Sequence, residues 1–109
     1  MLRIYNVMLE AVSIEAPLIR AIARHDKDLA DQTRRAANSV VLNVAEGSGS
    51  FGGVRTTRYR TALGSARENV GCLHAAACHG YIPPMPRELV LKMNHVIGTS
   101  RCASTPTGL

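Results

Sequence analysis

The sequence predicts an all-α protein that folds as an antiparallel, up-down-up-down four-helix bundle. Aromatic residues make up only 4% of the 109 residues, so the core should be aliphatic and rich in alanine, which suits close-packed helices better than β-sheets. Apolar residues recur every three or four positions in four separate segments, which is the period of an amphipathic helix. The connections between these segments are short, which favours antiparallel neighbours.

The first two helices are expected over residues 2–24 and 27–46. Asp26 or Asp28 can cap the second helix by accepting hydrogen bonds from its first backbone N–H groups. The second helix carries one apolar stripe, which consists of Leu29, Thr33, Ala37, Val40, Val41 and Val44. Gly47 follows the stripe and predicts a left-handed cap that ends the helix, because glycine adopts that conformation without strain.

The last two helices are expected over residues 55–79 and 86–98. A glycine- and serine-rich turn precedes the third helix, and Gly80 ends it. The third helix has apolar residues in alternating steps of four and three, the heptad pattern of antiparallel bundles: Tyr59, Leu63, Ala66, Val70, Leu73 and Ala77. We therefore expect one domain over residues 1–98, followed by a flexible C-terminal tail over residues 99–109.

A polar stripe on the second helix has a matching stripe on the third. If the two helices turn back at residues 50–53, level residues have a nearly constant sum of residue numbers. The expected pairs are Glu46 with Arg58, Asn43 with Thr61, Ser39 with Ser65, and Arg35 with Glu68. The outer pairs have opposite charges and the inner pairs can hydrogen-bond, so we expect this polar seam at a helix–helix contact, within the chain or between subunits. The alternative is two solvated faces that match by chance.

Two glycines one heptad apart, Gly64 and Gly71, lie on the third helix beside the polar seam. Since glycine has no Cβ, another helix could approach closely at these positions. We therefore expect them to take part in packing or assembly.

The charge balance and the cysteines limit the classes of function. The chain carries 13 lysine and arginine residues against 8 aspartate and glutamate residues, a net charge of +5. Only Lys27 and Lys92 are lysines, and arginine binds phosphates and carboxylates bidentately, which suits an acidic partner. Three cysteines without framework spacing predict reduced thiols and a cytoplasmic protein. No apolar run is long enough to cross a bilayer, so we expect no membrane partner.

The arginines near the central turn are the candidates for contact with nucleic acid. Arg55, Arg58 and Arg60 gather at the start of the third helix, and Arg34 and Arg35 lie on the second. Because the polar seam uses Arg35 and Arg58, the stronger candidates are Arg34, Arg55 and Arg60, with Arg58 as a further one. No aromatic stacking platform accompanies them, so sequence-specific reading of single strands is not expected. The alternative is a solvated surface with scattered arginines.

No constellation of residues predicts catalysis, a cofactor or a metal site. Residues 47–52 match the glycine spacing of a dinucleotide-binding fingerprint, but a helix rather than a strand precedes them. His74 and Cys78 share a helical face, yet two ligands do not make a structural metal site. His25 and His95 are expected to be isolated surface residues. The sequence therefore predicts a protein without enzymatic activity.

Four segments carry a family resemblance: LADQTRRAA at residues 29–37, NVAEG at 43–47, ALGSARE at 62–68 and GYI at 80–82. Together they resemble the "four helix bundle protein" family. That family includes proteins encoded by intervening sequences inside bacterial 23S ribosomal RNA genes, and it is related to the accessory proteins of diversity-generating retroelements. The resemblance covers roughly half of the chain, in the second and third helices and their exits.

The resemblance implies a four-helix bundle that assembles as a barrel-like homopentamer and has no known enzymatic activity. It also implies that the retroelement relatives bind nucleic acid and a reverse transcriptase through a basic surface. The Asn-x-Ala-Glu-Gly segment of the family falls on Asn43, Ala45, Glu46 and Gly47, and its Gly-Ser pair falls on Gly64 and Ser65. These matches imply roles in packing, capping and assembly.

Two functions are therefore expected from the sequence. The first is a non-enzymatic, oligomeric scaffold or adaptor that binds structured RNA, DNA or a nucleic-acid-bound partner, such as a reverse transcriptase, through its basic surface. The second is a protein-directed assembly factor with no nucleic-acid role. Retention on heparin or RNA that is lost at moderate salt distinguishes the first from the second.

Overall fold

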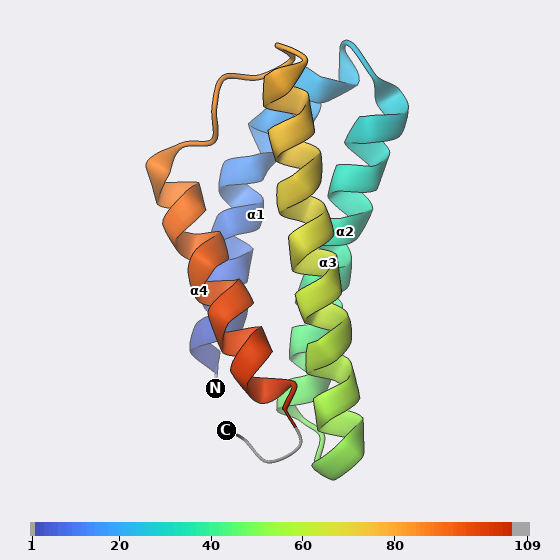
Figure 1. The fold of residues 1–109 in the computed structure, drawn as a ribbon, viewed down its shortest axis with the longest axis vertical. Coiled ribbons are helices and arrows are strands. Elements are labelled where there is room, and N and C mark those ends of the chain that lie inside the picture. The colour runs from blue at the N-terminus through green and yellow to red at the C-terminus, as the bar shows by residue number, and fades with distance from the viewer. Residues whose placement is uncertain (1, 106–109) are drawn as a thin grey trace.

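Four α-helices make up most of the computed structural model, which describes residues 2–105 (Figure 1). They are α1 (Leu2–Ala23), α2 (Lys27–Ser48), α3 (Gly52–Cys78) and α4 (Arg87–Ala103). Consecutive helices run in opposite directions, so the α1–α2 turn and the α3–α4 loop lie at one end of the bundle (Figure 1). The α2–α3 turn lies at the other end. The protein is an antiparallel up-down-up-down bundle, which confirms the fold predicted from its sequence.

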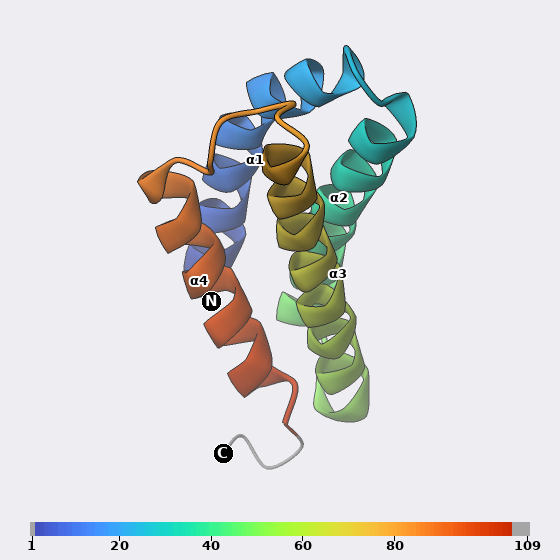
Figure 2. The same ribbon diagram turned by 45° about the horizontal axis from the view of Figure 1, so that its top comes forward.

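Each helix packs against two neighbours around one elongated core. The most extensive contact joins α2 to α3, while α1 packs against α2 and α4, and α4 also packs against α3. Figure 2 shows the α3–α4 loop crossing the same end of the bundle as the α1–α2 turn. This arrangement places the start of α1 and the end of α4 beside the α2–α3 turn.

The core is aliphatic and contains many alanines, as the composition predicts. Its large, fully buried side chains include Met8, Ile22, Val40, Leu73 and Leu89. Small residues let the helices approach each other between these side chains, and they include Ala11, Ala30, Ala37, Ala62, Ala66 and Ala76. Among residues 2–105, none of the helices has the length and apolar character needed to cross a membrane.

The predicted apolar stripe on α2 faces this core. Thr33, Ala37, Val40 and Val44 are buried, and the other two members of the stripe are half-buried. The buried helical face therefore agrees with the prediction from its period.

The buried seam of α3 is displaced from the predicted one. Leu63, Val70 and Ala77 are only half-buried. The buried positions follow a heptad that runs through Tyr59, Ala62, Ala66, Asn69, Leu73 and Ala76. The predicted heptad was misplaced because the polar residue Asn69 occupies a core position, where the pattern was expected to be apolar.

Two of the predicted helix ends are confirmed. The backbone N–H of Leu29 donates to the Asp26 carboxylate at 3.0 Å, which makes Asp26 the N-cap of α2. At the end of α3, Gly80 has a φ of +80°, and the N–H of Tyr81 donates to the carbonyl oxygen of Ala76 at 2.9 Å. This hydrogen bond is the Schellman closure of a helix C-terminus.

Gly47 does not end α2, so the prediction of a left-handed cap there is wrong. The helix continues to Ser48, and the described glycines with a positive φ are Gly52 and Gly80. Gly47 is buried, and a Cβ atom built on it would lie 2.9 Å from the Tyr59 ring. Gly47 therefore permits close packing of α2 against α3 rather than a backbone turn.

The last helix also extends further than predicted, since α4 passes through Gly98 and ends at Ala103. Residues 99–103 of the predicted flexible tail are therefore helical. A glycine inside a helix costs about 1 kcal/mol, which the burial of Leu89, Met93 and Val96 on the core face of α4 can offset. Residues 106–109 of the predicted tail lie outside the described residues.

Candidate nucleic-acid interface

Three of the four arginines predicted to contact nucleic acid lie together, and the fourth does not. Arg55, Arg58 and Arg60 are in the first three turns of α3. Arg34 lies in the middle of α2, roughly 20 Å along the helix axis from its C-terminal end at 1.5 Å per residue. It forms an ion pair with Asp31 one turn earlier in the same helix. The structure therefore separates Arg34 from the group and pairs its charge with an acidic neighbour.

Arg55 is held in place by the end of α2 and by an aromatic ring. Its Nη1 donates to the carbonyl oxygen of Gly47 at 3.2 Å, and its guanidinium carbon lies 4.9 Å from the centroid of the Tyr59 ring. The buried Tyr59 shares a hydrogen bond of 3.1 Å with the Ser48 hydroxyl. Since the carbonyl and the ring are neutral, they fix the position of Arg55 without neutralising its positive charge.

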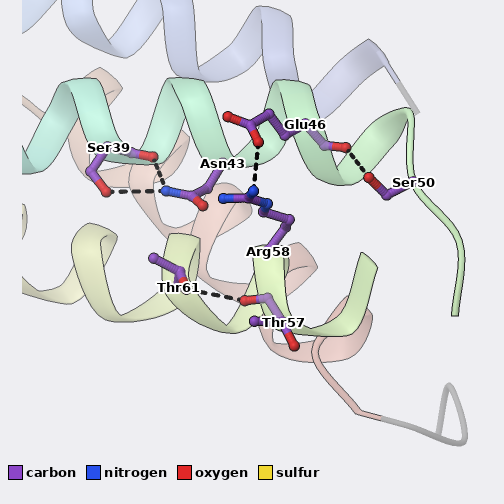
Figure 3. A network of polar contacts seen from close by, with 7 residues as sticks. All are labelled: Ser39, Asn43, Glu46, Ser50, Thr57, Arg58 and Thr61. Carbon is purple, nitrogen blue, oxygen red and sulfur yellow. Dashed lines mark hydrogen bonds and ion pairs between the residues drawn. The ribbon is translucent and has the colours of Figure 1, made fainter. Parts of the chain in front are cut away.

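Arg58 and Arg60 differ in whether an acid neutralises them. Arg58 Nη2 lies 2.9 Å from the Glu46 carboxylate, in an ion pair that joins α3 to α2 (Figure 3). Arg60 Nη2 instead donates to the carbonyl oxygen of Ser104, at 3.4 Å, just beyond the end of α4. The positive charge of Arg60, like that of Arg55, is therefore not neutralised by a described acidic side chain. Arg58 is instead paired with Glu46, as the polar seam predicts.

Two further arginines lie at this end of the bundle. Arg3 is in the first turn of α1 and Arg101 is in the last turn of α4, so the antiparallel topology brings both toward the start of α3. We term this part of the surface the arginine end; it consists of Arg3, Arg55, Arg58, Arg60 and Arg101. Of these five, Arg58 alone forms an ion pair with another residue in the described part of the chain. Glu10 of α1, which interacts electrostatically with Arg3, is paired with Lys92 at 2.8 Å.

The sequence-based selection missed Arg3 and Arg101 because they are far from α3 along the chain. The predicted helix directions could have identified both arginines, since the start of the first helix and the end of the fourth helix lie at the same end of an up-down bundle. The selection also overlooked Phe51 in the α2–α3 turn, whose side chain is 88% exposed at the same end. One ring is not a series of stacking platforms, but it can contact a base.

The opposite end of the bundle has a mixed charge. Arg24 and Lys27 alternate with Asp26 and Asp28 at the α1–α2 turn, and Arg87 precedes Glu88 at the start of α4. Positive charge is therefore concentrated at the arginine end.

Aromatic stacking also distinguishes the opposite end. Tyr81 stacks on His25 at 4.9 Å between ring centroids and on His79 at 5.1 Å. His25 is therefore not the isolated residue expected from the sequence, because the α3–α4 loop folds over it.

Two of the four predicted pairs of the polar seam are present. Glu46 pairs with Arg58, and the hydroxyls of Ser39 and Ser65 share a hydrogen bond of 2.7 Å. Asn43 does not bond to Thr61. Its Nδ2 donates to the carbonyl and hydroxyl oxygens of Ser39, at 2.8 and 3.2 Å, within α2 (Figure 3). Thr61 likewise donates to the carbonyl oxygen of residue 57 within α3, because a threonine hydroxyl readily reaches back one turn.

The fourth predicted pair is also wrong, because Gln32 takes the place of Arg35. Gln32 Nε2 donates to the Glu68 carboxylate at 3.4 Å, and Arg35 has no hydrogen bond or ion pair with any described residue. A constant residue-number sum treats the helices as parallel rods. Bundle helices cross at about 20°, so side chains lose this register away from the turn. The polar seam is nevertheless a helix–helix contact within the chain.

Gly64 and Gly71 lie on exposed positions of α3, and no helix of the chain approaches them. A Cβ atom built on either would have no heavy atom of another element within 4 Å. Among residues 2–105 they therefore take no part in packing between helices, and their role in assembly stays a prediction.

A buried polar cluster, formed by Glu15, Thr33 and Asn69, was not predicted. Asn69 Nδ2 donates to Glu15 Oε1 at 2.8 Å and to the carbonyl oxygen of Thr33 at 3.0 Å, and all three residues are fully buried. Glu15 Oε2 and Asn69 Oδ1 accept no hydrogen bond from described residues. Burial raises the pKa of Glu15 to about 7, against a smaller opposing effect of the hydrogen bond from Asn69. The carboxyl group is therefore largely protonated below neutral pH.

Nothing in residues 2–105 assembles a metal centre, since no three His, Cys, Asp or Glu side chains come within reach of one ion. Cys72 is buried, and burial raises the pKa of its thiol, which makes it a poor nucleophile. The arrangement of charge at the arginine end is therefore the feature best suited to contact a ligand.

Comparison with known proteins identifies one family. Residues 4–98 match the family model described as 23S rRNA-intervening sequence protein, so the match includes all four helices up to Gly98. No curated protein and no solved structure matches the chain.

Proposed function

The chain belongs to the 23S rRNA-intervening sequence protein family, and we propose that it is a non-enzymatic helical-bundle scaffold that self-associates and binds structured RNA through its arginine end. The supporting observation is the separation of charge along the bundle. Arg3, Arg55, Arg60 and Arg101, which form no ion pair with a described residue, gather where the α2–α3 turn meets the start of α1 and the end of α4. At the opposite end basic and acidic residues alternate, so their charges largely cancel and produce no comparable positive potential.

Arginine suits this role because its guanidinium can bind a phosphate with two hydrogen bonds. Arg55 and Arg60 are each anchored by one hydrogen bond to a neutral carbonyl, so they are oriented and retain donors for a ligand. Less side-chain entropy is then lost on binding. These contacts read the phosphate backbone, and Phe51 supplies a single ring for a base, so recognition would depend on RNA shape more than on sequence.

Self-association would multiply these contacts. In a closed ring of subunits, every arginine end would be repeated around the axis, and simultaneous contacts raise the affinity well above that of one subunit. The exposed glycines Gly64 and Gly71 have space for a second helix, and the family resemblance implies a homopentamer. A nucleic-acid-bound protein, such as a reverse transcriptase, would reach the same surface together with its nucleic acid.

The test of RNA binding is a gel shift with a structured RNA hairpin at several salt concentrations. Affinity should fall steeply with salt, by a slope of about one for each phosphate contact. The double variant Arg60→Gln/Arg101→Gln should bind more weakly with a shallower slope, because both arginines lie at the arginine end. The matched control is Arg24→Gln/Arg87→Gln at the opposite end, which should bind like the unmodified protein.

An equal loss in the control pair would contradict the assignment to the arginine end. A protein that never binds the hairpin at low salt would contradict RNA binding altogether. If such a protein still self-associates, the protein-directed assembly factor is the better description of its function.

The test of self-association is light scattering on the purified protein at micromolar concentration. We expect a mass that is a multiple of 11.7 kDa, reduced toward that of one chain by Gly64→Leu. Asn94→Leu, an exposed substitution on α4, should leave the mass unchanged. A monodisperse monomer of the unmodified chain would refute self-association.

A further inference from the structure

A recess lies at the arginine end, between α1, α3 and α4. Its volume is about 320 Å³, and the polar side chains that line it are Arg3, Arg55, Tyr59, His95 and Thr99. We propose that this recess binds a phosphate group of a nucleic acid. This inference rests on the RNA contact proposed above, and it names the part of the RNA that enters the protein.

The chemistry of the lining selects an anion. Two guanidinium groups and one imidazole contribute to the recess, and no acidic side chain lines it. Arg55 and His95 are half-buried, whereas Arg3 is exposed. Charges that are partly buried interact more strongly with a ligand than charges on an open surface. A phosphate would therefore gain more here than at an isolated surface arginine, which is worth little in water.

The geometry of the lining is partly fixed before a ligand arrives. Arg55 is held by the Gly47 carbonyl and the Tyr59 ring, as described above, and Tyr59 is held by Ser48. Arg3 forms no hydrogen bond or ion pair in the described structure, so its donors are available to complete the site from α1. A fixed arginine and a free one can close on a phosphate from two helices.

The neighbouring groove explains why Arg3 remains available. Arg3 and His95 also border a groove between α1 and α4 that contains Glu10 and Lys92. Glu10 attracts Arg3 weakly, but its carboxylate is paired with Lys92 at 2.8 Å, and this pairing lowers the pKa of Glu10. Lys92 thus satisfies the acid that would otherwise draw Arg3 away from the recess.

The size of the recess admits more than a bare phosphate. Small-molecule pockets have volumes of about 300–1,000 Å³, so this recess falls at the lower limit of that range. A phosphate at the end of an RNA strand could enter with its ribose, and a phosphate inside a strand could rest at the mouth. Both sources share the same chemistry.

Inorganic phosphate is the first probe, followed by NMR of the full chain. We expect saturable shifts of the Thr99 amide and the His95 ring signals. Arg3→Gln should weaken phosphate binding about tenfold, the loss expected for one charge-assisted hydrogen bond. Arg20→Gln is the matched control, because it removes an exposed arginine from the same helix far from the recess.

Two outcomes of this titration would overturn the site. One is the absence of saturable shifts at Thr99 and His95. The other is an equal loss of phosphate affinity in Arg3→Gln and Arg20→Gln. Because Arg3 is exposed and makes no hydrogen bond with any of residues 2–105, its substitution should leave the protein folded and the result interpretable.

RNA hairpins with a 5′-phosphate or a 5′-hydroxyl distinguish the two sources of phosphate. If the terminal group enters the recess, the phosphorylated hairpin binds more tightly, and Arg3→Gln removes that advantage. If an internal phosphate enters, Arg3→Gln weakens both hairpins equally and by more than Arg20→Gln does. If Arg3→Gln reduced the affinity for neither hairpin, the recess would be refuted as a phosphate site.

The failure of this inference differs from the failure of the proposed function. Salt-dependent hairpin binding that is insensitive to Arg3→Gln would refute the recess and leave RNA binding at the arginine end standing. Phosphate binding in the recess by a protein that binds no hairpin would refute the proposed function instead.

Discussion

Two sets of polar contacts connect α3 to its neighbours, and they differ in how much water reaches them. The buried polar cluster, Glu15, Thr33 and Asn69, lies entirely inside the bundle. The polar seam runs along the outer edge of α2 and α3, where the side chains of Glu46 and Arg58 are about half exposed, at 54% and 43%. We expect folding to depend on the buried polar cluster, whereas the polar seam only adjusts the register of α2 against α3.

The physical difference lies in what replaces a lost partner. A residue of the seam that loses its partner is solvated by water, so the free energy changes little. A residue of the cluster has no such replacement, and an unpaired acceptor inside the core costs its desolvation energy. The following predictions test this difference, beginning with the substitution expected to have the largest effect.

Asn69→Ala should be the most destabilising of the changes considered. Asn69 donates to both Glu15 Oε1 and the Thr33 carbonyl. Its removal leaves the buried Glu15 carboxyl without a hydrogen-bond partner among the described residues, whereas the Thr33 carbonyl keeps the backbone hydrogen bond that it accepts within α2. We expect the free energy of unfolding to fall by about 3 kcal/mol, from the unpaired Glu15 acceptor and from the cavity that the shorter side chain leaves. Urea denaturation monitored by circular dichroism measures this loss.

Asn94→Ala is the control, because Asn94 is exposed on α4 and forms no hydrogen bond with described residues. Its effect should stay within about 0.5 kcal/mol. If the two alanine variants lost equal stability, the buried polar cluster would contribute no more to folding than an exposed polar residue does. The proposed difference between the cluster and the polar seam would then be wrong.

The second prediction concerns pH. Glu15 has a pKa of about 7 in the folded protein against an ordinary value of 4.5, so the folded state keeps a proton that the unfolded state releases. Stability should therefore be highest below pH 4.5 as far as this group is concerned, and it should fall as the pH rises through 7. The total change is about 3 kcal/mol, at 1.36 kcal/mol for each pKa unit.

Glu15→Gln isolates this effect, because an amide does not titrate and its oxygen can still accept the hydrogen bond from Asn69. The fall in stability between pH 4.5 and 7 should be absent from this variant. The lowered pKa of Glu10 acts in the opposite direction and below this range, since its contribution is lost only as Glu10 is protonated. An identical pH profile in the two proteins would show that Glu15 is ionised when folded.

Gly47→Ala tests the packing of α2 against α3 at the end of the polar seam. A Cβ at this position would lie 2.9 Å from the Tyr59 ring and 3.3 Å from Arg58 Cβ, so the buried ring or the two helices must move. We expect a loss of about 2 kcal/mol in thermal or urea unfolding, as for other overpacked sites. Gly98→Ala has open space around its Cβ and should instead gain up to about 1 kcal/mol from helix propensity. A gain in both variants would refute the close contact.

The same contrast shows what could be predicted from the sequence. The apolar periods predicted four helices and their directions, because packing of aliphatic stripes follows from local spacing. The seam was partly predictable, since Glu46 and Arg58 have complementary charges close to the turn, where the register is fixed. Further from the turn, the crossing of the helices moved Gln32 into the place expected for Arg35.

The buried polar cluster could not be predicted in this way. Acids are rarely buried, so Glu15 resembles a surface residue of α1, and Asn69 interrupts the heptad that it belongs to. Their bond joins residues 54 positions apart, and no local spacing reveals it. The candidate site has the same limitation, because Arg3, Arg55 and His95 come from three helices and meet only through the topology.

The smallest effects are expected in the polar seam itself. A double-mutant cycle with Arg58→Gln and Glu46→Gln should give a coupling energy of about 0.5 kcal/mol, because the pair is half exposed and salt weakens it. The cycle with Arg35→Gln and Glu68→Gln should give a coupling near zero, since these two side chains do not meet. Both cycles are measured by urea unfolding at low salt, where screening is least. Equal coupling energies in the two cycles would mean that the charges interact equally whether or not the side chains are in contact. The polar seam would then be a solvated surface that does not fix the register of α2 against α3.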